Sequence, residues 1–269
     1  MINKKIGIIG CGNMGEALSS RLATVVEKST SLMVSDLDAA RRDFIQTKYK
    51  IIVTGENNYL VKHSDVIILA VKPKDFDSLL KELCCALSKD KLLISIAAGI
   101  TTKHIENIVG KDIPVIRVMP NIAAIIGEAI SSVSAGSSAS KKDLGLAKDI
   151  FSTIGDVVEV DEDLVDAVTS ISGSGPAYFF YLIEALIEAA KDLGFDEGIA
   201  KKLVSKTAFG SMKLLEALKE DPALLRAKVT SKGGTTEAAI KVFEDKRLKD
   251  ILKMAVRRAY ERSKELSKS

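Results

Sequence analysis

The feature that most restricts the fold of this chain is a glycine-rich turn close to its start. Residues 6–9 form a short apolar run that predicts a β-strand, and residues 16–24 continue at helical spacing. Between them lie three glycines in the spacing G-x-G-x-x-G, namely Gly10, Gly12 and Gly15. This motif is informative when it joins a strand to a helix, as it does here. The chain therefore predicts a β-α-β unit with a dinucleotide site at its first turn.

Each glycine has a separate physical role in such a turn. Gly10 permits the tight turn, Gly12 lets the backbone approach a pyrophosphate, and Gly15 lets the helix pack closely on the strand. The free N–H groups at the helix N-terminus also attract phosphate. We therefore expect the whole turn to bind a dinucleotide cofactor, through Gly10, Cys11, Gly12, Asn13, Met14 and Gly15. The alternative is a plain glycine-rich turn.

Strands and helices alternate through the first part of the chain. Apolar runs predict strands at 6–9, 32–35, 51–53, 66–71, 92–96, 115–119, 130–134 and 156–160. Helical patterns fall at 16–28, 39–49, 58–63, 76–87, 103–109 and 141–154. Such alternation is typical of an α/β fold with a mostly parallel sheet and helices on both faces. We expect a Rossmann-like doubly wound domain over residues 1–160.

The pattern changes to helices alone after residue 160. They are predicted at 164–170, 177–193, 196–218, 222–229, 235–243 and 248–266. We therefore expect a second, all-α domain over residues 161–269. The stretch 177–190 is apolar nearly all round, which favours an oligomer interface. A helix buried at the centre of the bundle is the alternative.

Composition excludes several classes of function. Lys and Arg number 39 against 36 Asp and Glu, and Trp is absent, so a nucleic-acid surface is not expected. No apolar run reaches the roughly 20 residues of a membrane helix, and no signal peptide is recognisable, so we expect a cytoplasmic protein. Three cysteines and two scattered histidines argue against a metal site or a catalytic triad. A bound cofactor must then supply the chemistry.

The residues themselves do not decide between NAD and NADP. Asp36 follows the second predicted strand, about 20 residues after Gly15, where an acid binds the adenosine ribose and favours NAD. Ser35, Arg41 and Arg42 lie beside it and could instead bind the 2′-phosphate of NADP. The two arginines are also ordinary surface residues of a helix.

Two further positions are expected at the same crevice. Residues Ala70-Val71-Lys72-Pro73 end a strand, and the carboxyl ends of strands line the ligand crevice of a doubly wound sheet. Asn57 lies in the loop before the helix that leads into that strand. We assign Asn57, Ala70, Val71, Lys72 and Pro73 to the cofactor site, with ordinary loop residues as the alternative.

Two loops of small polar residues stand out in the helical part. Ser172-Gly173-Ser174-Gly175-Pro176 is expected to form a tight loop between two helices. The second loop, Thr230 to Thr236, opens a helix with backbone N–H groups and hydroxyls that would suit a carboxylate. An ordinary N-cap is the alternative, although a cap needs only one such residue.

These pieces, in this order, resemble pyrroline-5-carboxylate reductases over nearly the whole chain. The matching segments are Gly10–Ala17, Ala70–Pro73, Asp166–Tyr178 and Val229–Ala239. The resemblance implies reduction of 1-pyrroline-5-carboxylate to L-proline, the last step of proline biosynthesis, with NADPH and with NADH as the alternative. It implies a homodimer through the helical domain, sometimes assembled into a larger ring such as a decamer.

The resemblance also assigns the substrate site. It places the carboxylate and ring nitrogen of the substrate on Ser231, Gly233, Gly234, Thr235 and Thr236. Thr236 is expected to bond the ring nitrogen and to act as the catalytic residue. A cyclic imine that arrives protonated needs orientation rather than a strong protein acid, which agrees with a loop of Ser, Gly and Thr. One departure is Lys232, where the family usually has Pro.

Two other functions remain as alternatives. A β-hydroxyacid dehydrogenase has a similar domain order, but its catalytic Lys would fall at Phe179 of this chain. A regulator that senses NAD(P)H without turnover would not need the loop at Ser231–Thr236.

Overall fold

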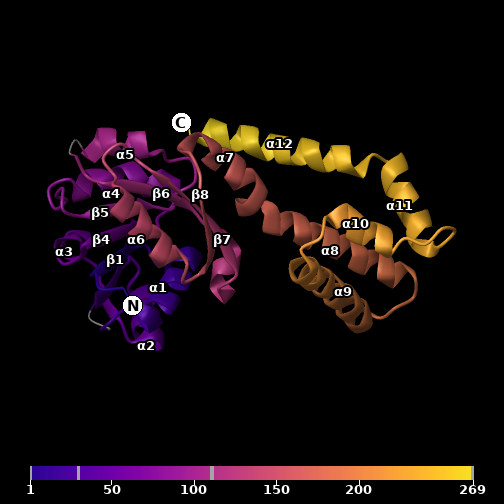
Figure 1. Ribbon diagram of the computed structural model, residues 1–269. Helices are drawn as coiled ribbons and strands as arrows, with labels where there is room; N and C mark the ends of the chain where they lie inside the picture. Colours follow the sequence, from indigo (N-terminus) through magenta and orange to yellow (C-terminus); the bar gives the residue numbers. More distant parts are fainter. Residues whose placement is uncertain (1, 29–30, 110–111, 268–269) are drawn as a thin grey trace. The chain divides into compact units, whose positions relative to one another are not determined.

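The computed structural model describes residues 2–28, 31–109 and 112–267 (Figure 1). It divides into two compact units. The first contains Met1–Ser174 together with Ala259–Ser269, and the second contains Gly175–Arg258. The helical domain that we expected from residue 161 therefore contributes its first helices and its last turns to the first unit.

The first unit is built on an eight-stranded sheet with the order β3-β2-β1-β4-β5-β6-β7-β8. Neighbouring strands are parallel except β6 and β7, which pair antiparallel. The strands are β1 Ile6–Ile9, β2 Leu32–Ser35, β3 Ile52–Thr54, β4 Val66–Leu69, β5 Leu92–Ser95, β6 Val115–Met119, β7 Ala129–Ala135 and β8 Gly155–Glu159. The expected mostly parallel, doubly wound sheet is confirmed.

Helices cover both faces of this sheet (Figure 1). The two covered faces can be seen in strand β4. Its adjacent residues Ile67 and Ile68 point to opposite faces of the sheet, and each belongs to a different buried apolar cluster. Leu18 and Leu22 pack in the same cluster as Ile68. The helices are α1 Asn13–Val25, α2 Ala39–Tyr49, α3 Asn57–Lys62, α4 Phe76–Leu83, α5 Thr102–Val109, α6 Lys141–Phe151 and α7 Val165–Val168. Short turns of other helix types are η2 Pro73–Asp75, η3 Ile122–Ile126, η4 Glu162–Leu164 and η5 Thr169–Gly173.

The second unit consists of helices, as expected. They are α8 Gly175–Asp192, α9 Glu197–Leu218, α10 Pro222–Lys228, α11 Thr235–Asp245 and α12 Leu248–Leu266, whose last turns belong to the first unit. In α8 only Gly175 is buried, while Phe180 and Tyr181 are 65% and 73% exposed. The alternative of a helix buried within the bundle of one chain is therefore wrong. The apolar face of α8 lies open on the single chain.

Several predicted boundaries differ from the structure, such as the helix expected at 76–87, which ends at Leu83, and two of the differences change how a segment is described. The strand expected at 66–71 ends at Leu69, and the residues that follow it turn into η2. The expected loop at Ser172–Pro176 is helical instead, with the π-helical turn η5 running almost directly into α8. The Ser172 hydroxyl donates to the Val168 carbonyl, and Pro176 sits in a first turn, where its missing N–H costs nothing.

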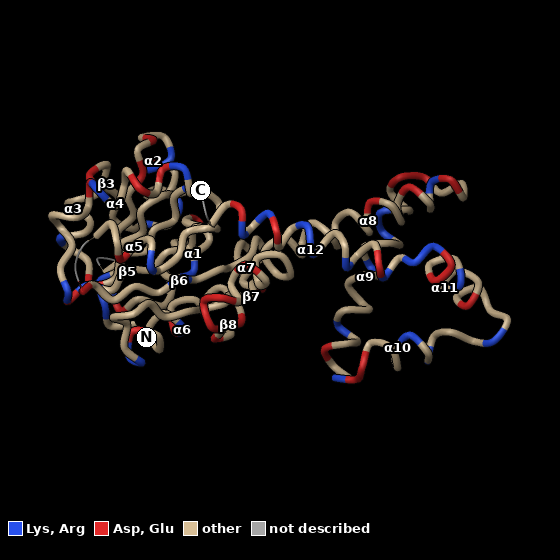
Figure 2. The backbone as a smooth tube through the Cα atoms, turned by 90° about the horizontal axis from the view of Figure 1, so that it is seen from above, with Lys and Arg blue, Asp and Glu red and all other residues tan. Residues whose placement is uncertain are grey.

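Charge is distributed evenly over the described chain. Lys and Arg alternate with Asp and Glu along both units (Figure 2). Among the described residues, no helix is both long enough and apolar enough to cross a bilayer.

Candidate functional site

A cleft of about 500 Å³ opens where the strand order reverses, at the carboxyl ends of β1, β2 and β4. Ligands bind at such switch points in open α/β sheets. The cleft brings together most of the predicted cofactor residues: Gly10, Gly12, Ser35, Asp36, Asn57, Ala70, Val71 and Lys72.

The three glycines of the turn meet different surroundings. Gly10 has a φ of 101°, and its N–H donates to the Ser35 carbonyl at 2.7 Å. A Cβ on Gly15 would lie 1.9 Å from the Gly10 carbonyl oxygen, so helix α1 can pack here only without a side chain. A Cβ on Gly12 would meet no atom within 4 Å, which leaves this backbone open to a ligand. Helix α1 starts at the next residue, with no side chain capping it.

The remaining predicted residues do not line the cleft. Cys11 is fully buried, and burial together with the nearby Asp36 carboxylate raises the pKa of its thiol to about 12. Its backbone N–H donates to Asp36 Oδ2 at 2.7 Å, so Cys11 contributes its main chain only. Asn13, Met14 and Gly15 belong to α1, and Pro73 opens η2 beside the cleft.

Ser35 and Asn57, both predicted to bind the cofactor, are hydrogen-bonded to each other in the cleft. The buried Ser35 hydroxyl donates to Asn57 Oδ1 at 2.6 Å. The Asn57 amide nitrogen lies 3.4 Å from Glu82 Oε2 of α4. Sequence reasoning missed Ser78, Leu79 and Glu82, which also line the cleft. These three residues lie on one side of helix α4, which begins shortly after Lys72-Pro73, and this spacing could have predicted them.

A second hollow of about 640 Å³ adjoins the first and shares Lys74 with it. It continues the same edge of the sheet towards β5, where Ala98 and Gly99 line it. Both residues lie shortly after the end of β5, so reasoning from the carboxyl ends of strands could have included them.

The predicted substrate loop lies in the second unit, between α10 and α11. Gly233 has a φ of 72°, and its N–H donates to Glu237 Oε2 at 2.7 Å. The N-cap of α11 is Gly234, and no side chain caps it. The N-cap role that we weighed for these hydroxyls is thus not used. Among the described residues, no hydrogen-bond partner is found for the Thr235 and Thr236 hydroxyls.

A hollow of about 630 Å³ lies between α10 and α11 and touches only part of this loop. Gly233, Gly234 and Glu237 line it. Ser231, Thr235 and Thr236 do not line it, whereas Thr230 at the start of the loop does.

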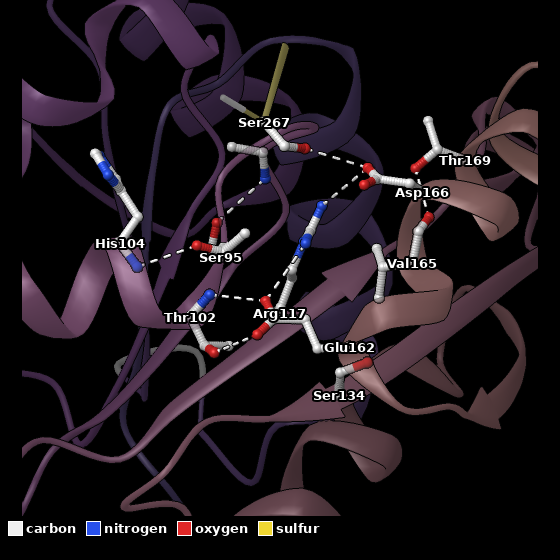
Figure 3. Close-up of polar contacts among 12 residues, drawn as sticks. Ser95, Thr102, His104, Arg117, Ser134, Glu162, Val165, Asp166, Thr169 and Ser267 are labelled. Atoms are coloured by element: carbon white, nitrogen blue, oxygen red, sulfur yellow. Dashed lines mark hydrogen bonds and ion pairs between the residues drawn. The ribbon is translucent and has the colours of Figure 1, made fainter. Parts of the chain in front are cut away.

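A buried polar cluster surrounds Arg117 of β6 (Figure 3). Its side chain is 2% exposed and forms ion pairs with Glu162 at 3.4 Å and Asp166 at 3.8 Å. Glu162 accepts the N–H and the hydroxyl of Thr102, where α5 begins. No sequence pattern singled out this cluster.

Comparisons with known proteins agree with this architecture. A family model described as pyrroline-5-carboxylate reductase dimerisation matches residues 162–266, and one described as NADP oxidoreductase, coenzyme F420-dependent, matches residues 5–99. Pyrroline-5-carboxylate reductases of Synechocystis and Methanosarcina acetivorans are each 40% identical, with 98% and 100% of both chains covered.

Solved structures extend the likeness to the fold. A pyrroline-5-carboxylate reductase from Coxiella burnetii superposes with a TM-score of 0.93 at 34% identity, covering 100% of both chains. A Plasmodium falciparum pyrroline carboxylate reductase with NADP bound has a TM-score of 0.89 at 31% identity, covering 99% of both chains. Together these likenesses show that the chain belongs to the pyrroline-5-carboxylate reductase family.

Proposed function

We propose that the protein reduces 1-pyrroline-5-carboxylate to L-proline with a reduced nicotinamide dinucleotide. The observation that carries the proposal is the cleft at the switch point of the sheet, in a chain that is similar to these reductases over its full length. The family resemblance implies NADPH, with NADH as the alternative.

The residues of the cleft fit a dinucleotide. Gly12 leaves room for the pyrophosphate, and the uncapped start of α1 offers free N–H groups to it. Asp36 would accept a ribose hydroxyl, while Asn57 and the segment Ala70–Pro73 would contact the rest of the cofactor. When bound, the nicotinamide supplies the hydride.

The loop from Ser231 to Thr236 is our proposed substrate site. No side chain caps α11 at Gly234, so the N–H groups after Gly233, whose own N–H is bonded to Glu237, favour a carboxylate, and Lys232 adds a positive charge beside them. The Thr236 hydroxyl would hydrogen-bond the ring nitrogen and orient the C=N bond for the hydride. The carbon of this bond gains the hydride, and the nitrogen keeps the proton with which the imine arrives.

Assembly through the helical unit follows from its open apolar faces. Phe179, Phe180 and Leu186 of α8 are 57%, 65% and 52% exposed, and the matched family model describes dimerisation. A second copy would cover this surface. We propose a homodimer in the cytoplasm, with a larger ring such as a decamer as its higher assembly.

The test follows the cofactor by absorbance with two substrates and in a control without substrate. We expect NAD(P)H to be oxidised with pyrroline-5-carboxylate and not without it, and we expect no reduction of NAD(P)+ with 3-hydroxy acids. Reduction of NAD(P)+ by 3-hydroxy acids, without oxidation of NAD(P)H by the imine, would favour a dehydrogenase instead. A 3-hydroxyisobutyrate dehydrogenase from Mycobacterium tuberculosis shares the fold at 12% identity and a TM-score of 0.53, but Phe179 stands where we place that family's catalytic Lys.

A further inference from the structure

We infer that the cleft selects NADH over NADPH, with Asp36 as the discriminating residue and Glu16 as the positioning residue that keeps Arg41 away from the adenosine ribose. The inference rests on the proposed function, because it concerns the cofactor of that reaction. The two cofactors differ only in the phosphate on the 2′-hydroxyl of this ribose. The residues around that hydroxyl therefore decide the preference.

Asp36 is held in place by the main chain. Its Oδ2 accepts the Cys11 N–H at 2.7 Å, and its Oδ1 accepts the Asp38 N–H at 2.9 Å. Each carboxylate oxygen can accept a second hydrogen bond, so ribose hydroxyls can still donate to Asp36. A 2′-phosphate has no such donor and carries negative charge. Because both oxygens are tied, the carboxylate cannot easily turn away from it.

Arg41 is the first candidate partner for a 2′-phosphate, but its guanidinium is already bonded to other groups of the protein. Its Nε donates to the Cys11 carbonyl at 2.6 Å, and its Nη2 forms an ion pair with Glu16. Glu16 also accepts the Lys48 ammonium at 3.0 Å and the Tyr49 hydroxyl at 2.7 Å.

The ionisation of Glu16 agrees with its ion pair to Arg41. Burial acts to raise the pKa of Glu16, but hydrogen bonds from Tyr49, Lys48 and Arg41 outweigh it and lower this pKa to about 2. Glu16 is therefore a carboxylate throughout the neutral range, and Arg41 stays paired with it.

Arg42 is the second candidate, and it is also engaged. Its Nη1 donates to the Asp36 carbonyl at 2.7 Å and to the Leu37 carbonyl at 3.1 Å. The guanidinium packs against Gly55 rather than lining the cleft. Among the described residues, the cations that line the cleft are Lys72 and Lys74, which follow β4, whereas Asp36 follows β2.

The test compares the two cofactors on one preparation. Dissociation constants for NADH and NADPH come from nicotinamide fluorescence, and kcat/KM values come from turnover of pyrroline-5-carboxylate. Like charges brought together in a binding site cost several kcal/mol, so we expect NADH to be favoured about tenfold or more. Asp36→Asn keeps one acceptor for the loop and removes the charge. It should bring the NADH to NADPH ratio close to one.

A second variant isolates the positioning role of Glu16. In the double variant E16Q/D36N, Arg41 loses its ion-pair partner, and we expect a preference for NADPH. The matched control is Asp43→Asn, which removes the same charge from an exposed position of α2 and should leave the ratio unchanged.

Each contrary result is decisive. Tighter binding of NADPH by the wild type would overturn the inference. A D36N variant that melts like the wild type but keeps its ratio, or a D43N variant that shifts it equally, would overturn the role of Asp36. If E16Q/D36N matched D36N, Glu16 would have no positioning role. Unequal dissociation constants without any imine turnover would reject the proposed function and leave the selectivity standing.

Discussion

The carboxylate of Asp166 lies 3.8 Å from the guanidinium of Arg117 (Figure 3), and it also accepts the hydroxyl of Ser263 at 2.6 Å. Ser267 donates to the same oxygen at 3.2 Å. One acid in α7 thus joins strand β6 to the last turns of α12. The chain leaves the first unit after η5 and returns to it through α12, so Asp166 links both the departing and the returning segment to β6.

Arg117→Met should therefore destabilise the protein strongly. Removing one partner of a buried ion pair leaves the others uncompensated, which costs about 3–5 kcal/mol. Because Glu162 and Asp166 are 23% and 16% exposed, we expect the lower end of this range. Denaturant unfolding measures the loss. The control is Lys148→Met, which removes the exposed pair with Glu159 and should cost less than about 1 kcal/mol. Equal effects of the two variants would contradict our view of the cluster.

The glycine turn provides a matched pair of substitutions. Gly15→Ala would place a Cβ against the Gly10 carbonyl, so we expect a loss of stability of about 1–3 kcal/mol or more. Gly12→Ala meets no protein atom, so the melting temperature should not fall. Cofactor affinity should nevertheless drop with Gly12→Ala, because the methyl group would occupy the place of the pyrophosphate. Normal cofactor binding by Gly12→Ala would show that the pyrophosphate lies elsewhere.

Thr236 offers a test of the proposed catalytic contact. Loss of a hydrogen bond to a charged group costs about 1.5–3 kcal/mol, which is roughly a ten- to hundredfold fall in kcat/KM. We expect this fall for Thr236→Ala and Thr236→Val, recovery in Thr236→Ser, and unchanged cofactor affinity in all three. Steady-state kinetics and a melting curve on the same preparations decide. A Thr236→Ala enzyme that turns over normally would end the catalytic assignment.

The apolar face of α8 predicts a dimer at micromolar concentration. Phe180→Asp should weaken it, because a carboxylate would be buried without a partner between two copies. Light scattering measures the mass of each variant. Lys206→Asp is a control that changes charge at an exposed residue of α9. A wild type that is monomeric under these conditions would contradict the proposed interface.

The regular parts of this fold could be predicted from the sequence because they depend on local patterns. Buried strands such as β4 read as apolar runs, and Asp196 and Pro222 mark the starts of their helices. The helical course of Ser172–Pro176 could not be read in this way. The Ser172 hydroxyl bonds to the Val168 carbonyl of the preceding turn, so residues that usually form loops continue a helix.

The candidate site also contains residues that local patterns predict and residues that come together only through folding. The residues of the turn at Gly10 were recognisable from their spacing, whereas Glu82 approaches Asn57 only after folding. Asp166 and Ser263 are separated by 97 positions, and no local pattern connects them. The roles of Arg41 and Arg42 were open for a similar reason, since their partners are backbone carbonyls and one distant carboxylate.

The most direct test of the central claim is to measure cofactor oxidation and product together. Purified protein is incubated with pyrroline-5-carboxylate and either NADH or NADPH, the oxidised cofactor is followed by absorbance, and proline is quantified by chiral chromatography. We predict one L-proline for each cofactor molecule oxidised, and no oxidation without the imine. Cofactor binding with no formation of L-proline from either cofactor would contradict the account.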